Sequence, residues 1–368
     1  MIKKACFALS AMTLLTATAP AMASSEEIEM LKRQIAALEQ RIAAREAVEV
    51  QAKEPAPQQT SIGDRVTISG TVEVEGATSN KTDWADDSNS DITVATVELA
   101  IAAQITDSID TEIVLLHEED DTPLEVDVAV INFADVAGTG AMVTLGQTYV
   151  PFGAFETNMV NDTLVLELAE TRETVAMIGW ENNGFSVAGY VFNGDTDSDN
   201  TAVENFGISA GFSNDDVAAG VDYISNVLDS DGISGTATAS TEDYAGIVLH
   251  GQVNLGAVSV IAEYLMIEKL DASKITSTEI TSNIEPEALQ LEVAFDAGDY
   301  TFAIAYQETD EAVELGQPEE RISLGASTDL DENVSLAFEL WHDEDYSVAD
   351  GGTGVDADSF VAQVAVSF

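Results

Sequence analysis

The sequence predicts an all-β chain, a transmembrane antiparallel up-and-down β-barrel of about 16 strands, preceded by a short α-helical coiled coil. Three observations predict it. Apolar and polar side chains alternate along many short stretches, the links between these stretches are alternately short and long, and the chain ends on an aromatic residue. Together these features are typical of a barrel in an outer membrane.

The alternation has a period of two residues, which is the period of a β-strand. In "VTISGTVEVEG" Val72 and Val74 share one face, and Glu73 and Glu75 share the other. In "LQLEVAF" apolar residues alternate in the same way with Gln290 and Glu292. One apolar and one polar face fit either a half-solvated soluble sheet or a membrane barrel.

The links between the predicted strands decide between these two folds. The short links are 106–108, 135–139, 182–183, 213–215, 254–256, 297–299 and 329–331. The long links are 77–90, 119–123, 149–171, 193–203, 226–240, 268–285, 307–319 and 343–355. Outer-membrane barrels have tight periplasmic turns and long external loops, so this order favours the barrel over 63–368.

The final stretch, "SFVAQVAVSF", alternates up to Phe368 and is typical of the last strand of such a barrel. An even number of strands places both ends of the barrel in the periplasm. A barrel of this size encloses an aqueous lumen.

The residues before the barrel divide into three segments. Residues 1–23 have the charged start, apolar centre and Ala-Met-Ala end of a signal peptide, and contain Cys6, the chain's single cysteine. Residues 24–50 place Ile28, Leu31, Ile35, Leu38 and Ile42 on a coiled-coil seam. A lone amphipathic helix packed on the main domain is the alternative. Residues 51–62 are a polar linker, and the coiled coil predicts a periplasmic contact between copies of the chain.

The composition is strongly acidic, with 67 Asp and Glu against 13 Lys and Arg, a net charge of −54. Such a chain repels nucleic acid, which excludes that class of partner. Two explanations of the acidity stay open. It forms a pathway that attracts cations, or it keeps the protein solvated in a saline habitat.

The link over 149–171 is the one that bears most on function, because it is long, irregular and rich in apolar residues. Two placements are open: folded into the lumen as a constriction, or outside as a cap or a contact with a neighbouring subunit. Pro151 and Gly153 direct the chain out of the strand. The predicted constriction residues are Pro151, Phe152, Gly153, Phe155, Glu156, Asn158 and Arg172.

Alternation also predicts which polar side chains face the lumen. The predicted pore-lining residues are Glu73, Glu75, Glu98, His250, Gln290, Glu292 and Arg321. A weak loop site for Ca²⁺ or Mg²⁺ is a further hypothesis, with a solvated acidic loop as its alternative. Its candidate ligands are Asp343, Asp345, Asp350, Asp356 and Asp358. No Gly-x-Ser-x-Gly motif occurs, and the three histidines lie far apart in sequence, so we expect no enzyme and no cofactor.

Several of these stretches also resemble a known family. "GQTYVPFG" is similar to the Gly-x-x-x-x-Pro-Phe-Gly turn of several substrate-selective porins, although Gln147 stands where that turn often has a basic residue. With "HEEDDTPLEVDVAVI", "YVFNGDTD", "QETDEAVELGQPEERI" and "WHDEDYSVADGGTGVDAD", the chain resembles the LbtU-type siderophore porins over most of 65–368.

The resemblance implies an outer-membrane barrel, embedded in outer-membrane lipid, that passes a small solute such as a ferric siderophore. It also implies that the barrel lacks the plug of energised receptors, and residues 24–62 are too few to form one. The alternative is a general, cation-leaning diffusion porin or a structural barrel.

Overall fold

The computed structural model describes residues 65–81, 88–119, 122–196 and 202–368. The predicted signal peptide, coiled coil and linker lie outside these residues. The first part of the barrel contains β1 (Val66–Ser79), β2 (Asn89–Thr106), β3 (Ile109–His117), β4 (Glu125–Phe133), η2 (Val136–Gly138), β5 (Ala141–Tyr149), α3 (Leu166–Ala169), β6 (Arg172–Asn182), β7 (Phe185–Phe192), β8 (Asn205–Ser213) and β9 (Val217–Ile224).

The second part completes the barrel and its loops. It contains η3 (Val227–Asp229), α4 (Asp231–Ser234), β10 (Ala239–Ser240), β11 (Gly246–Leu255), β12 (Val258–Ile267), β13 (Ile275–Thr276), β14 (Glu287–Ala297), β15 (Tyr300–Asp310), η4 (Val313–Leu315), β16 (Glu320–Asp331), β17 (Val334–Glu344) and β18 (Ala357–Ser367).

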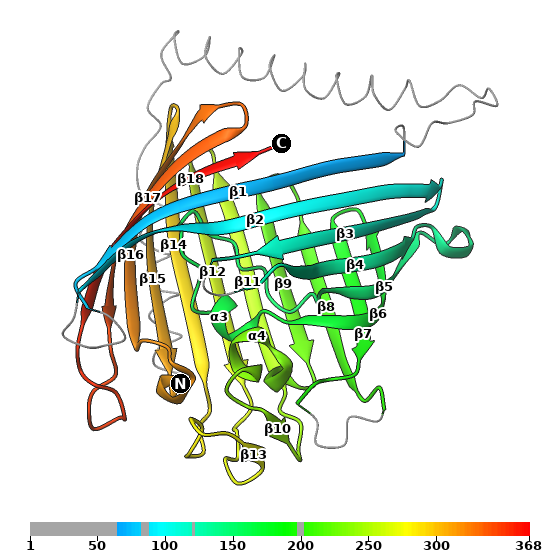
Figure 1. Ribbon diagram of the computed structural model, residues 1–368. Helices are drawn as coiled ribbons and strands as arrows, with labels where there is room; N and C mark the ends of the chain where they lie inside the picture. The colour runs from blue at the N-terminus through cyan, green and yellow to red at the C-terminus, as the bar shows by residue number, and fades with distance from the viewer. Residues whose placement is uncertain (1–64, 82–87, 120–121, 197–201) are drawn as a thin grey trace, which may run out of the picture. The chain divides into compact units, whose positions relative to one another are not determined.

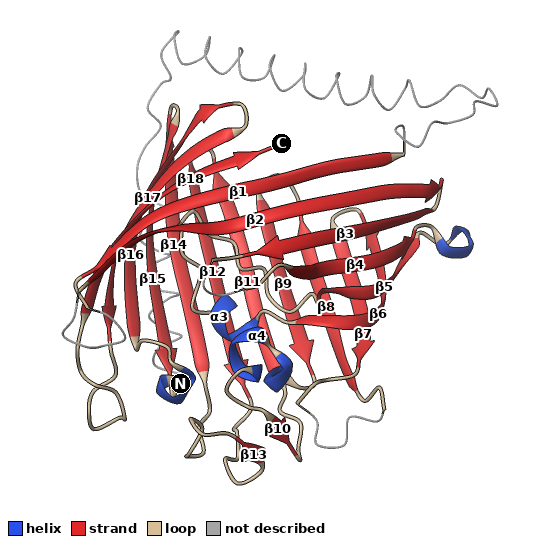
Figure 2. Cartoon of the chain, in the orientation of Figure 1, coloured by secondary structure: helices blue, strands red, loops and turns tan. Residues whose placement is uncertain are grey.

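The strands form one closed antiparallel barrel, in which each strand pairs with its neighbours and β1 pairs with β18 (Figures 1 and 2). Sixteen strands take part, so the predicted fold class is confirmed for the barrel. The sequence did not predict β10 and β13, which pair with each other in the loops. No described helix has the length and apolarity needed to cross a membrane.

The alternation in the sequence gives the barrel wall an apolar outer surface and a polar or small-residue inner surface. Outward positions are apolar and exposed, for example Phe295 (49% exposed), Ile304 (52%) and Leu324 (53%). Inward positions on the same strands are small, such as Ala294 and Ala305, or polar, such as Gln290. Apolar side chains outside and polar or small ones inside are what lipid and an aqueous lumen require of a barrel wall.

The turns at one end of the barrel are tight. Asn183 and Gly184 both have positive φ (53° and 80°), as the two central residues of a type I′ hairpin turn do. The described parts of the longer links lie at the other end, as the antiparallel order of the strands requires. There the apolar cluster forms beneath the loops, from residues such as Phe152, Leu168, Leu228, Ile233 and Leu270. The main apolar core therefore lies where the loops pack on the inner wall.

Candidate functional site

The segment between β5 and β6, residues 150–171, folds along the inner wall of the barrel and contains the short helix α3 (Figure 1). We call it the inner loop. It begins at Val150 and Pro151, and Gly153 (φ 114°) and Phe155 (φ 55°) bend its backbone. A non-glycine residue with positive φ is disfavoured, so contacts elsewhere must hold this turn.

Two wall carboxylates hold the start of the inner loop. The Gly153 amide donates to Asp222 Oδ2 on β9 at 3.0 Å. The amides of Ala154 and Phe155 donate to the two oxygens of Glu263 on β12, at 2.7 and 2.9 Å. Three successive backbone donors are thus satisfied by charged acceptors, which form stronger hydrogen bonds than neutral ones.

The middle of the inner loop is held in the same way. Glu292 on β14 accepts hydrogen bonds from the Asn158 amide (2.9 Å), the Asn158 side chain (2.6 Å) and the Thr157 hydroxyl (2.7 Å). Glu339 on β17 accepts from the amides of Val160 and Asn161, at 2.9 and 2.8 Å. Gln307 on β15 accepts from the Leu164 amide at 2.7 Å.

These four carboxylates, which we call the anchor row, come from β9, β12, β14 and β17. They are Asp222, Glu263, Glu292 and Glu339, and each is at most 2% exposed. Because their oxygens meet loop donors, their charges are shielded from the open lumen. The inner loop is therefore fixed to one side of the barrel by several contacts that are each worth about 1.5–3 kcal/mol.

Apolar packing fixes the two ends of the inner loop. Phe152, Leu164, Val165 and Leu168 are at most 1% exposed. Glycines on the wall make room for the loop. A Cβ at Gly246 would lie 2.6 Å from Phe152, and one at Gly325 would lie 2.8 Å from the Met159 sulfur.

The wall formed by β1, β2 and β3 carries carboxylates without such partners. Glu73 and Glu75 on β1 and Glu98 on β2 are partly exposed. Gln363 donates to Glu75 at 2.8 Å, but none of the three forms an ion pair within the described residues. Glu98 has Asp127, Glu112 and Glu73 as its charged neighbours. We call β1–β3 the free wall.

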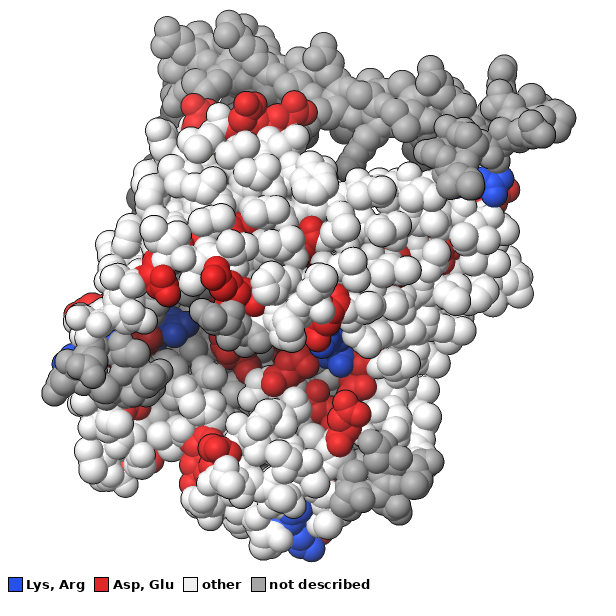
Figure 3. All heavy atoms as spheres, in the orientation of Figure 1, with Lys and Arg blue, Asp and Glu red and all other residues white. Residues whose placement is uncertain are grey.

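The inner loop adds its own acidic residues to the side that faces the free wall. Asp162 is exposed, and its nearest charges include Glu118, Glu73, Arg321 and Glu339. Although water reaches this side chain, the barrel around it desolvates the carboxylate, and this desolvation, followed by the carboxylates of Glu118 and Glu73, raises the pKa of Asp162. Burial, and then Asp231, raise the pKa of Glu170 to about 7. Figure 3 shows acidic side chains gathered around a recess in the viewed face of the barrel.

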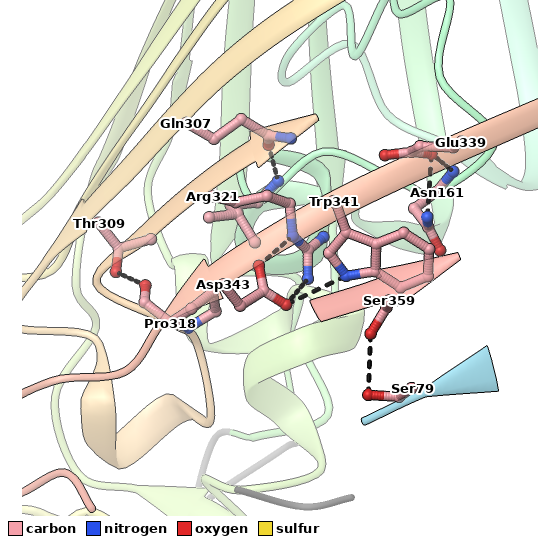
Figure 4. A network of polar contacts seen from close by, with 11 residues as sticks. Ser79, Asn161, Gln307, Thr309, Pro318, Arg321, Glu339, Trp341, Asp343 and Ser359 are labelled. Carbon is pink, nitrogen blue, oxygen red and sulfur yellow. Dashed lines mark hydrogen bonds and ion pairs between the residues drawn. The ribbon is translucent and has the colours of Figure 1, made fainter. Parts of the chain in front are cut away.

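The described arginines nearest to these groups are paired. Arg321 Nε donates to Asp343 Oδ1 at 2.7 Å, and Trp341 Nε1 donates to Asp343 Oδ2 at 3.2 Å (Figure 4). Arg172 contacts Glu125 at 2.6 Å and Asp127 at 2.8 Å. Each arginine is thus neutralised by a neighbour.

The structure separates the predicted constriction residues into two groups. Pro151 to Asn158 lie on the inner loop, with Glu156 exposed and Phe152 buried, whereas Arg172 begins β6 and joins it to β4. The predicted pore-lining set also divides. Glu73, Glu75 and Glu98 lie on the free wall, and Gln290 and Glu292 lie beneath the inner loop, where Gln290 donates to the Glu156 carbonyl at 3.1 Å. His250 lies 3.2 Å from Asp222.

The five candidate metal ligands do not converge on one point. Four of them contact different protein partners. Asp343 pairs with Arg321, Asp345 accepts from Thr353, Asp350 accepts from Ser347, and Asp358 contacts His342. Asp356 lies in the link before β18. Within the described ranges, no group of three or more His, Cys, Asp or Glu residues is arranged to hold a metal ion.

Sequence reasoning missed most of the anchor row. Asp222, Glu263 and Glu339 were not among the predicted site residues, and neither was Asp162. One signal was available in the sequence: Glu263 alternates with the apolar residues Ile261 and Leu265, which share its face of the strand. In the structure both of these neighbours are buried. An ionised residue on a buried face needs a partner, which here is the backbone of a loop more than a hundred residues away.

The chain is similar in sequence to one protein family and to several bacterial proteins. A family model described as Gram-negative porin matches residues 8–347. A UPF0422 protein of Legionella pneumophila (strain Lens) is 24% identical over 352 residues, which cover 82% of this chain and 66% of that protein. A UPF0422 protein of Coxiella burnetii is 26% identical over 306 residues, covering 77% and 65%. The chain therefore spans just under two thirds of the length of these relatives.

Solved structures share the fold at low sequence identity. An anion-selective porin from Comamonas acidovorans has a TM-score of 0.58 at 14% identity, covering 82% of this chain and 99% of that one. The outer-membrane channel DcaP of Acinetobacter baumannii has a TM-score of 0.59 at 12% identity, covering 82% and 97%. OprB of Pseudomonas putida has a TM-score of 0.60 at 10% identity, covering 83% and 95%.

Proposed function

Because this chain belongs to the Gram-negative porin family, we propose that its barrel is a passive, plug-less channel that prefers small cationic and neutral solutes. The observation that carries the proposal is the acidity on both sides of the open lumen. Asp162 of the inner loop lies in Coulombic range of Glu73 on the free wall. Fixed carboxylates in a confined pore raise the local concentration of cations.

The paired arginines support the same preference. An anion pathway needs positive groups that are free to contact the solute, but Arg321 and Arg172 each contact a carboxylate. The Comamonas protein is described as anion-selective, and we propose that this chain differs from it in selectivity while it shares the fold.

Reversal potentials across a planar bilayer test this proposal. We expect K⁺ to be preferred over Cl⁻ at 0.1 M salt, where the Debye length is about 10 Å, and the preference to weaken at 1 M, where it is about 3 Å. Preference for Cl⁻ at the lower salt concentration would refute the proposal. A preference that salt does not change would mean that the fixed charges do not cause it.

Passage of a ferric siderophore is the second candidate, supported by the resemblance of the sequence to the siderophore porins. An acidic lumen adds a condition: neutral or cationic ferric chelates should pass more readily than polyanionic ones at low salt. Uptake of a ferric hydroxamate, compared with ferric citrate, is measured in cells with and without this protein. Uptake should also survive loss of the inner-membrane energiser. If it stops with the energiser while the protein is present, the passive route is wrong.

We further propose that residues 24–50 form a periplasmic coiled coil that joins copies of the chain, after removal of 1–23. The seam residues named above support this proposal. Deleting 24–50 should leave the barrel heat-modifiable and abolish oligomers captured by chemical cross-linking. Unchanged cross-linking would locate the contact elsewhere.

A further inference from the structure

The turn that leads β5 into the inner loop depends on one buried carboxylate. Gly153 and Phe155 hold positive φ values there, and the Gly153 amide donates to Asp222 Oδ2 at 3.0 Å. Asp222 is 2% exposed. Its other oxygen, Oδ1, is buried and has no hydrogen-bond partner in the part of the chain that the structure describes. Oδ2 therefore carries the contacts that stabilise this carboxylate.

His250 supplies the second contact to the same oxygen. Its Nε2 lies 3.2 Å from Asp222 Oδ2, and it donates when this nitrogen carries a proton. A buried carboxylate without a donor or an opposite charge is costly, so His250 stabilises the ionised Asp222. The Gly153 amide in turn donates to this same oxygen, so the contact from His250 holds the acceptor of the turn in place.

The wall is shaped to hold the His250 ring in this position. His250 on β11 is the direct cross-strand partner of Gly220 on β9. A Cβ at Gly220 would lie 2.3 Å from His250 Nε2, so the ring occupies the space that a side chain at Gly220 would fill. Asp222 is two residues further along β9, on the same inward face.

We propose that His250 is a positioning residue for the constriction, acting through Asp222 to hold the turn at Gly153. His250 needs no contact with the solute in this role. The inference rests on the proposed function only in that the inner loop narrows the path of the solute. It goes beyond that function by naming the side chain that keeps the constriction in one conformation. His250 contacts Asp222, and Asp222 accepts the hydrogen bond of the Gly153 amide.

The test compares two variants that both fill the space of the ring. His250→Leu removes the donor, whereas His250→Gln keeps one. In single-channel recordings we expect His250→Leu to increase open-channel current noise several-fold and to produce brief higher-conductance states. His250→Gln should restore a steady current. Gln252→Leu, on the next inward position of β11, is the matched control and should remain as quiet as the natural protein.

A double-mutant comparison tests whether His250 acts through Asp222. Asp222→Asn alone should be noisy, and adding His250→Leu to it should increase the noise no further, because residues in one chain of contacts are not additive. A quiet His250→Leu channel, a noisy His250→Gln channel or additive noise in the double variant would each overturn the proposal. Heat-modifiability of each variant confirms that the barrel has assembled.

The two proposals fail in different ways. Noise is measured without reference to ion preference, so a wild-type pore that prefers anions would refute the proposed selectivity and leave the positioning role intact. Conversely, a quiet His250→Leu channel that still prefers K⁺ would refute the positioning role alone.

Discussion

Two parts of the barrel wall place the same side chain, glutamate, in different surroundings. On the anchor row, Glu263, Glu292 and Glu339 are buried and accept hydrogen bonds from the inner loop. On the free wall, Glu73 and Glu98 are partly exposed and have acidic neighbours. A carboxylate facing the lumen is therefore either a structural acceptor or, in the function we propose, a selectivity group, and contact with the inner loop distinguishes the two.

Removing the inner loop from the lumen should have the largest effect. We predict that replacing Ala154–Asp162 with a shorter Gly-Ser linker raises single-channel conductance several-fold, because a barrel of 16 strands otherwise leaves a wide aqueous channel. Residues 163–169 are kept, because Leu164, Val165 and Leu168 are buried in the apolar packing of the loop. Unchanged conductance in a heat-modifiable barrel would mean that this segment does not narrow the path.

Neutralising the free wall should have the next largest effect. In Glu73→Gln with Glu75→Gln, we predict a marked loss of K⁺ preference over Cl⁻ at low salt, because two fixed charges next to the path are removed. At high salt the natural protein and the variant should converge, since screening already weakens these charges. Reversal potentials at two salt concentrations measure this. A preference that is equal in variant and natural protein would assign selectivity to other groups.

A glutamate-to-glutamine substitution on the anchor row tests whether buried and partly exposed carboxylates differ in their effect on ion preference. Glu292→Gln replaces an acceptor oxygen with an amide NH₂ that faces the donors of Thr157 and Asn158. We predict increased current noise, with little change in reversal potential, because this charge is shielded by the loop. If Glu292→Gln reduced K⁺ preference as much as the free-wall pair does, the distinction between the two sides would be wrong.

The sequence predicted the barrel well because its evidence is local. Alternation along one strand, such as Val72 to Glu75, needs no knowledge of any other strand, and Asn183-Gly184 determines its own turn. Alternation also placed Glu292 on the inward face of its strand. It could not predict burial, because the Asn158 donor is 134 residues away in sequence.

The roles within the site depend on such distant partners, which explains why they could not be predicted. Glu73 and Glu292 look alike in sequence, since Glu73 stands between Val72 and Val74 and Glu292 stands between Leu291 and Val293. Only the course of the inner loop distinguishes them. Arg321 is similar, since its sequence context suggests a free cation in the lumen, whereas Asp343 on the neighbouring strand neutralises it.

The smallest expected effect concerns Glu170, at the end of the inner loop, where the loop contacts α4. Its carbonyl accepts the Asp231 amide at 2.8 Å, and burial raises the pKa of its side chain to about 7, above the ordinary value of 4.5. The folded protein therefore binds this proton more tightly than the unfolded chain does. Ionised Glu170 destabilises the folded barrel above pH 7, and the penalty is relieved as the pH falls from 7 towards 4.5.

We predict that the temperature of heat-modification rises as the pH is lowered through this range. Glu170→Gln should raise that temperature at alkaline pH and reduce its dependence on pH. The difference between the natural protein and the variant should be largest above pH 7 and should vanish towards pH 4.5. Glu156→Gln, an exposed glutamate of the same loop, is the control and should leave the profile unchanged. If Glu170→Gln instead lowered the temperature at alkaline pH, the prediction would be wrong. The ionised Glu170 carboxylate would then stabilise the folded barrel as a hydrogen-bond acceptor, as the carboxylates of the anchor row do.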